Sequence, residues 1–131
     1  MELAGKFIVI DGPDGSGKGT QLDRLAAWIS TQNGRCRRAR DPGGTEIGDR
    51  IRHVLLGYDL STMDPRCETL LFMASRAQLV AEIIRPALAA GETVLCDRYI
   101  SATCAYQGAV GSLPEDVIAL GRLAVGQTWP H

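Results

Sequence analysis

The chain alternates short runs rich in β-branched residues with longer stretches in which apolar residues recur three and four positions apart. The first pattern predicts strands and the second predicts helices. Clusters of turn residues separate the two kinds of stretch. The predicted strands cover residues 6–11, 35–40 and 93–97. The predicted helices cover residues 20–33, 47–56, 64–91 and 114–126.

Glycine, asparagine and proline support these boundaries. Asn33-Gly34 favours a helix end, and Pro65 suits the first turn of a long helix. Pro86 predicts a kink inside that helix, because proline lacks an N–H and clashes with the preceding turn. The strand over residues 35–40 carries four arginines, which suit the edge of a sheet better than its centre.

Strands that alternate with helices predict an α/β fold in which helices flank both faces of a parallel sheet. The length of 131 residues fits one domain, residues 1–131. Ligands bind such sheets beyond the carboxyl ends of the strands. We therefore expect three loops, Gly12–Thr20, Asp41–Gly44 and Asp97–Tyr99, to converge at one edge of the sheet.

The first of these loops has the pattern of a P-loop. A strand precedes it and a helix follows it, so its amide groups and the helix N-terminus can surround phosphate oxygens while Lys18 adds positive charge. Gly19 stands where Ser or Thr usually supplies a hydroxyl to magnesium. The alternative is an ordinary glycine-rich turn. The predicted phosphate-binding residues are Gly12, Pro13, Asp14, Gly15, Ser16, Gly17, Lys18, Gly19 and Thr20.

Composition narrows the function classes further. The net charge of −1 gives no overall attraction to nucleic acid or to a membrane surface, and no apolar run reaches membrane-spanning length. The arginines of residues 35–40 lack interleaved aromatic residues, which argues against a nucleic-acid patch. The four cysteines show no C-x-x-C spacing, so we expect free thiols and a cytoplasmic location.

Two further groups of residues carry candidate chemistry. Asp97 and Arg98 follow a buried strand, where a carboxylate can hold magnesium and an arginine can clamp a phosphoryl group. The alternative is a solvated ion pair. Phe72 and Arg76 lie on one line of a helix and suit a nucleobase, by stacking and by hydrogen bonding. The alternative there is a core phenylalanine beside a surface arginine.

Taken together, these motifs resemble the thymidylate kinase family. The segment Arg40-Asp41-Pro42-Gly43-Gly44-Thr45 is similar to that family's Arg-Glu-Pro-Gly-Gly-Thr, and three other segments follow in the family's order. These are residues 47–52, residues 70–78, and residues 97–99 with 105–108. The resemblance implies a nucleoside-monophosphate kinase with a P-loop NTPase-type three-layer fold, which uses ATP and Mg2+ to phosphorylate dTMP to dTDP.

The resemblance also implies roles for individual residues in the acceptor site. Phe72 would stack on thymine, Arg76 would reach its exocyclic oxygen, and Thr103 would read its ring nitrogen. Tyr106 would close the sugar pocket against a 2′-hydroxyl. The acceptor phosphate would be bound by Arg40, Arg52 and Arg98.

For the reacting groups, the resemblance implies that Lys18 holds the donor phosphates and that Arg98 and Asp14 assist the transfer. Asp14 and Asp97 are the candidate magnesium ligands. Asp41 replaces the family's usual Glu. A homodimer built through residues 47–56 and 70–84 is also implied.

Family members continue beyond the length of this chain with further strands and a lid. We therefore expect a C-terminally shortened form that holds phosphates but catalyses poorly. We also expect it to expose one edge of its first strand. Two alternatives remain open: a kinase for another nucleoside monophosphate, and a non-catalytic nucleotide-binding module.

Overall fold

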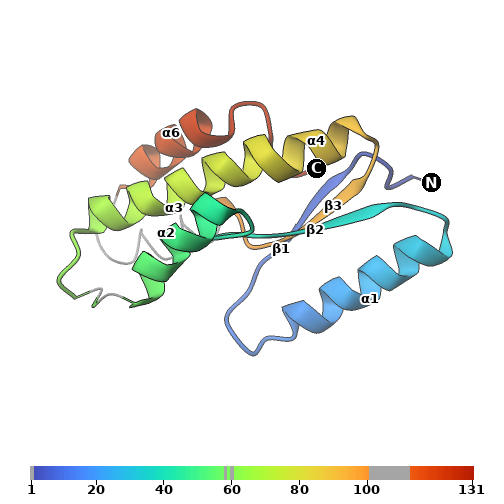
Figure 1. Ribbon diagram of the computed structural model, residues 1–131, viewed down its shortest axis with the longest axis horizontal. Coiled ribbons are helices and arrows are strands. Elements are labelled where there is room, and N and C mark those ends of the chain that lie inside the picture. The colour runs from blue at the N-terminus through green and yellow to red at the C-terminus, as the bar shows by residue number, and fades with distance from the viewer. Residues whose placement is uncertain (1, 58, 60, 101–112) are drawn as a thin grey trace.

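The computed structural model describes residues 2–57, 59, 61–100 and 113–131 (Figure 1). In this part of the chain a three-stranded parallel sheet has the order β1-β3-β2. The strands are β1 (Phe7–Ile10), β2 (Cys36–Arg40) and β3 (Thr93–Asp97). The helices are α1 (Lys18–Thr31), α2 (Glu46–Gly57), α3 (Pro65–Leu79), α4 (Arg85–Ala89) and α6 (Pro114–Val125), and the π-helical turn η1 (Val80–Ile84) joins α3 to α4. The predicted α/β architecture is confirmed.

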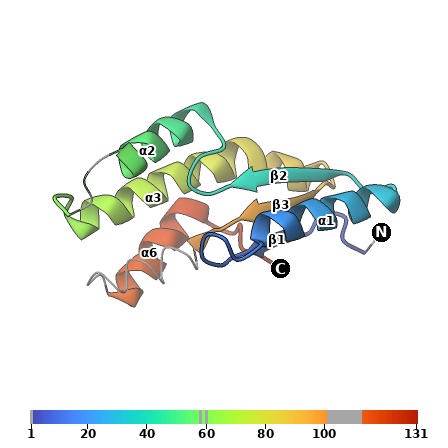
Figure 2. The ribbon, with the colours of Figure 1, turned by 90° about the horizontal axis from the view of Figure 1, so that it is seen from below.

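Helices cover both faces of the sheet (Figures 1 and 2). Alternate residues of the central strand β3 point to opposite faces: Val94 and Cys96 pack toward α3 and α4, whereas Leu95 packs against Leu22 and Ile29 of α1. All five of these side chains are fully buried. This double burial agrees with the continuous apolar run from Val94 to Cys96, as expected for a strand with both faces covered.

Strand β2 forms one edge of the sheet, as its arginines predicted. Arg37 pairs with Glu92 at 3.1 Å, and Arg38 pairs with Asp23 at 2.7 Å. Two of the four arginines of residues 35–40 are thus paired with carboxylates of neighbouring segments. None of the described helices combines the length and apolar character needed to cross a bilayer.

Strand β1 forms the opposite edge of the three-stranded sheet. At its first residue the outer side is engaged, because Phe7 N donates to His131 Nδ1 at 3.0 Å and His131 N donates to Phe7 O at 2.9 Å. The last residues of the chain therefore lie beside the start of β1.

The long helix predicted over residues 64–91 forms as three consecutive segments. Asp64 caps its start, and the irregularity expected at Pro86 takes the form of the π turn η1 just before it. A widened turn accommodates the proline ring, which would otherwise clash with the carbonyl four residues earlier.

Candidate functional site

Three loops meet at the carboxyl ends of the strands, as the sequence predicted. They are residues 11–17 after β1, residues 41–45 after β2 and residues 98–99 after β3, and we call this region the rim. Backbone hydrogen bonds tie two of the loops to the ends of neighbouring strands: Arg98 N donates to Ile10 O at 3.1 Å, and Asp41 N donates to Asp97 O at 3.1 Å. The rim is thus held together by the main chain and not by side chains alone.

The glycine-rich loop leads directly into the N-terminus of α1. Gly17 is the N-cap residue, with φ of 90°, and no side chain caps the helix there. A left-handed conformation at this position favours glycine. The first amide groups of α1 can therefore point toward an anion, and the helix dipole adds partial positive charge.

Lys18, at the start of α1, lies across the rim from β3. Its Nζ is 3.2 Å from Asp97 Oδ1, and the two side chains are 13% and 29% exposed. The lysine predicted to bind donor phosphates and the aspartate predicted to bind magnesium are thus neighbours.

Arg98 reaches over the glycine-rich loop. It donates to Gly12 O at 3.2 Å and to Asp14 Oδ1 at 2.9 Å. Its backbone is left-handed, with φ of 67°. The structure therefore brings Arg98 and Asp14, two of the predicted catalytic residues, into direct contact.

Arg40 and Arg52 lie beside the second loop. Arg40 is 3.6 Å from Asp49 Oδ1, and Arg52 donates to Pro42 O at 3.0 Å. Both arginines line an open groove of about 470 Å³. Burial, followed by repulsion from Arg40, lowers the pKa of Arg52 from its ordinary value. Two neighbouring cations at an open groove suit an anionic ligand group.

Phe72 and Arg76 occupy α3, but their environments differ. Phe72 is half-buried, whereas the side chain of Arg76 is 1% exposed. Arg76 Nε forms a short ion pair with Asp41, and its NH2 donates to Tyr99 O at 3.2 Å. The guanidinium also lies 5.5 Å from the centroid of the Tyr99 ring. The alternative of a surface arginine at this position is wrong.

Asp41 is itself fully buried. Burial raises the pKa of its carboxyl from its ordinary value, and the charge of Arg76 opposes this rise. The sequence predicted the loop but not the pairing of Asp41 with Arg76. An ionisable residue directly after a strand was the available signal, whereas its partner lies 35 positions away.

Ser75 and Asp49 also support the second loop and were missed. Gly43 N donates to Ser75 Oγ at 2.9 Å, and Gly44 N donates to Asp49 Oδ1 at 2.9 Å. A serine next to an arginine inside an apolar stripe was the only hint of this role. Thr103 and Tyr106 lie outside the described residues.

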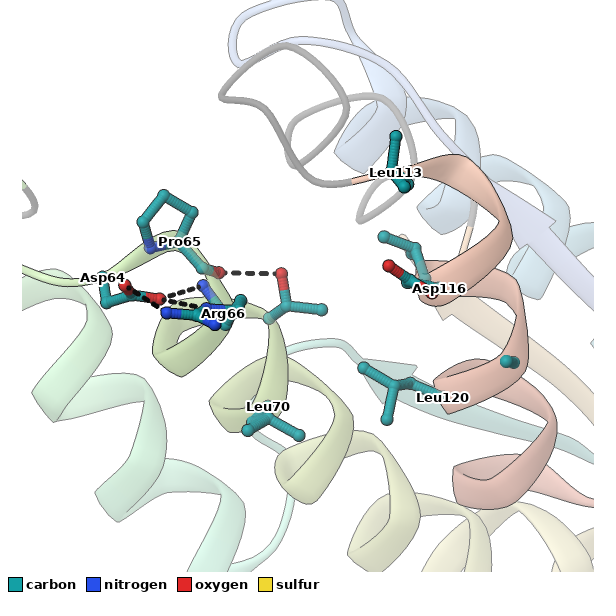
Figure 3. A pocket seen from close by; sticks show the side chains of 10 residues that line it. Asp64, Pro65, Arg66, Leu70, Leu113, Asp116 and Leu120 are labelled. Carbon is teal, nitrogen blue, oxygen red and sulfur yellow. Dashed lines mark hydrogen bonds and ion pairs between the residues drawn. The ribbon is translucent and has the colours of Figure 1, made fainter.

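A separate groove of about 560 Å³ lies between the start of α3 and α6 (Figure 3). Leu70 and Leu120 face it from the two helices, and Leu113 lies at its end. Among the described residues, none of the predicted site residues lines this groove.

Comparisons with known proteins agree on one family. The family model described as thymidylate kinase matches residues 10–126. A thymidylate kinase from Exiguobacterium sibiricum is 47% identical over 129 residues, which cover 98% of this chain and 61% of that protein. One from Pseudomonas syringae pv. tomato is 48% identical, with the same two coverages. The chain thus spans about three fifths of the length of these relatives.

A solved structure agrees with these sequence matches. The crystal structure of thymidylate kinase from Ehrlichia chaffeensis superimposes with a TM-score of 0.88 at 36% identity. The match covers 95% of this chain and 70% of that one.

Proposed function

Because the chain belongs to the thymidylate kinase family, we propose that its protein transfers the γ-phosphoryl group of ATP to dTMP, giving dTDP and ADP. One observation carries the proposal. The glycine-rich loop, Lys18, Asp97 and Arg98 lie at a single rim, with Lys18 3.2 Å from Asp97 and Arg98 2.9 Å from Asp14. Phosphoryl transfer needs this concentration of positive charge and backbone amides around the reacting phosphates.

The donor phosphates are held by the amides of residues 12–20 and by Lys18. The uncapped start of α1 supports this assignment, because its amide groups have no side-chain partner to displace. Lys18 exchanges Asp97 for phosphate oxygens when the nucleotide binds.

The acceptor phosphate is bound by Arg40, Arg52 and Arg98, which border the rim from three different elements. Phe72 and Arg76 on α3 receive the thymine base. In the family pattern Thr103 and Tyr106 complete the base and sugar contacts.

Asp14 and Asp97 suit a magnesium ion. Their carboxylates are 92% and 29% exposed, and Mg2+ is usually bound by one or two carboxylates together with water and substrate phosphates. The part of the chain that the structure describes holds no cluster of three or more ligating side chains. When bound there, the ion would neutralise charge on the donor phosphates.

The reaction is an in-line transfer. An oxygen of the acceptor phosphate attacks the γ-phosphorus, and the bond to the β-phosphate oxygen breaks, so ADP leaves. The attacking oxygen is already anionic, so the site needs no strong base. Arg98 stabilises the charge that spreads over the transferred group, and the fixed loops align donor and acceptor.

The protein acts as a homodimer in the cytoplasm. Ile47 and Val54 support the dimer, because they lie seven residues apart on one face of α2 and are 54% and 44% exposed. Cys36, Cys67 and Cys96 are free thiols, which suits a reducing compartment.

The test is a nucleotide assay by chromatography. The purified protein, ATP, Mg2+ and dTMP should yield dTDP and ADP in equal amounts, and Lys18→Met should abolish the reaction. UMP, dGMP and AMP serve as competing acceptors. Preference for one of these would show a different nucleoside-monophosphate kinase. Nucleotide binding by calorimetry without any diphosphate product would show a binding module.

A further inference from the structure

Three arginines in or beside the rim are paired with carboxylates of very different exposure. Arg40 is paired with Asp49, and both side chains are about half exposed. Arg98 is paired with Asp14, whose side chain is 92% exposed. Arg76 is paired with Asp41, and these side chains are 1% and 0% exposed. An exposed carboxylate can leave its arginine and be solvated by water when an anion binds, whereas a carboxylate buried in the core cannot.

Asp41 is fixed from its backbone as well as through its side chain. Its N donates to Asp97 O at 3.1 Å, which ties it to the end of the central strand. Two residues later, Gly43 N donates to Ser75 Oγ, so the loop is also tied to α3 beside Arg76. Separating Asp41 from Arg76 would leave a buried charge without compensation, which is strongly unfavourable.

The other contacts of Arg76 fix the orientation of its planar guanidinium group. Its NH1 lies 3.2 Å from Met73 Sδ, its NH2 donates to Tyr99 O, and its guanidinium lies over the Tyr99 ring. The guanidinium is therefore oriented before any ligand binds, and Asp41 supplies the charge that balances it.

We propose that Asp41 is a positioning residue for Arg76, and that it cancels the charge of Arg76 so that this end of the acceptor site selects an uncharged nucleobase over an anionic group. The inference deepens the proposed function and rests on it. Arg40 and Arg98 can release their carboxylates and receive a phosphate dianion. Arg76 keeps its carboxylate, so it can donate a hydrogen bond but offers no net charge.

The first experiment measures binding by calorimetry for wild type, Asp41→Asn and Asp41→Glu. The ligands are dTMP and its analogue with fluorine in place of the 5-methyl group, whose ring N–H is more acidic. Asp41→Asn should weaken dTMP binding about 10-fold, because Arg76 would no longer be held in the orientation in which it donates to the base. It should weaken the fluorinated analogue less, because an uncompensated arginine favours the anionic form of the base.

Asp41→Glu keeps the charge and should restore both affinities to within about 3-fold of wild type. The matched control is Asp23→Asn, which makes the same chemical change in the exposed pair with Arg38 and should change neither affinity. Equal weakening of both ligands in Asp41→Asn would overturn the selectivity claim.

The second experiment needs no ligand. NMR of arginine Nε–H groups should show a slowly exchanging signal that disappears in Arg76→Lys, and this loss assigns the signal to Arg76. That signal should exchange faster in Asp41→Asn and recover in Asp41→Glu. An unchanged signal in Asp41→Asn would show that Asp41 does not hold the guanidinium.

The two experiments separate the possible failures. If wild type binds neither ligand, the proposed function and the selectivity claim both fail, while the NMR signal still decides whether Asp41 positions Arg76. If Asp41→Asn does not fold, the ligand affinities of Asp41→Glu and Arg76→Lys test the proposal in its place. Arg76→Lys should lose dTMP affinity without gaining preference for the analogue, and unchanged affinity in that variant would refute a contact between Arg76 and the base.

Discussion

Arg98 reaches the glycine-rich loop from a left-handed backbone conformation, with φ of 67°. This conformation costs a residue with a Cβ about 1 kcal/mol or more, whereas glycine adopts it freely. The cost is tolerated at a residue that links β3 to the phosphate-binding loop. Strain of this kind is common where a side chain must be held in one direction for function.

Two substitutions at this residue separate its backbone from its side chain. Arg98→Ala should lower turnover about 100-fold or more while changing ATP affinity less than about 3-fold, because the guanidinium acts mainly in the transition state. Arg98→Gly should lose turnover equally, yet unfold at a higher temperature than Arg98→Ala because the strain is relieved. Steady-state kinetics and calorimetry measure both effects. Equal losses of ATP binding and turnover would contradict a transition-state role.

At the scale of single residues, the sequence predicted candidate chemical residues but did not predict which side chains pair with one another. Lys18, Asp97 and Arg98 were predicted because their motifs are local and follow strand ends directly. The buried pair of Asp41 and Arg76 was not predicted. Their pairing depends on how α3 packs against the end of β2, and spacing along a chain does not encode this packing.

At the scale of the secondary-structure elements, the stabilisation that the N-cap residue Asp64 gives to α3 should depend on pH. Asp64 accepts a hydrogen bond from Arg66 N at 2.8 Å and lies 3.2 Å from Arg66 Nε. The Arg66 side chain, and then its backbone amide, lower the pKa of the Asp64 carboxyl below its ordinary value. A lowered pKa in the folded state means that the stabilisation is present above about pH 4, the unfolded value, and is lost as the pH falls through the folded value.

Asp64→Asn tests this cap, because asparagine keeps the capping geometry without the charge. At pH 7 wild type should melt a few degrees above the variant. The difference should shrink steadily as the pH falls below about 4, because the carboxyl of wild type becomes protonated. Calorimetric melting at a series of pH values measures this. A constant difference across that range would show that the charge contributes nothing.

The contact between α2 and α3 depends on the small size of Gly48. A Cβ at this position would lie 2.8 Å from Thr45 Oγ1, 3.0 Å from Gly43 O and 3.1 Å from Ser75 Oγ. Gly48→Ala should therefore destabilise the protein by about 1–2 kcal/mol, since overpacking outweighs the gain in helix propensity. Gly57→Ala is the matched control, because it lies in the same helix with open space around it. Denaturant unfolding compares them, and equal stability of the two variants would exclude a steric role for Gly48.

The elements themselves were predictable because their periodicities and breakers are local. The starts of α3 and α6 fall at the predicted prolines, Pro65 and Pro114, and α2 ends at Gly57. The π turn η1 was not predicted in form. Pro86 predicts an irregularity in the helix. Whether the helix bends, breaks or widens there depends on the packing of Val80 and Ile84 in the core.

At the scale of the described molecule, the sequence predicted the edge position of β2 but not the full strand order. The arginine-rich β2 lies at an edge and β3, which is apolar from Val94 to Cys96, lies at the centre, so β1 lies on the other side. This order brings the loop after β3 between the other two. Asp97, at the end of the central strand, therefore contacts Lys18, and Arg98, directly after it, contacts the glycine-rich loop.

Assembly is the remaining property at this scale, and α2 offers the clearest test of it. Ile47 and Val54 present an apolar face that an isolated protein would leave in water. Ile47→Glu should weaken the proposed homodimer about 30-fold or more, as expected when a charge replaces an apolar anchor at an interface. Sedimentation equilibrium should then show monomers at concentrations where wild type is dimeric. The control Trp28→Glu changes a similarly exposed residue of α1, on the opposite face of the sheet, and should leave the dimer intact. Dissociation by both variants, or by neither, would place the interface elsewhere than on α2.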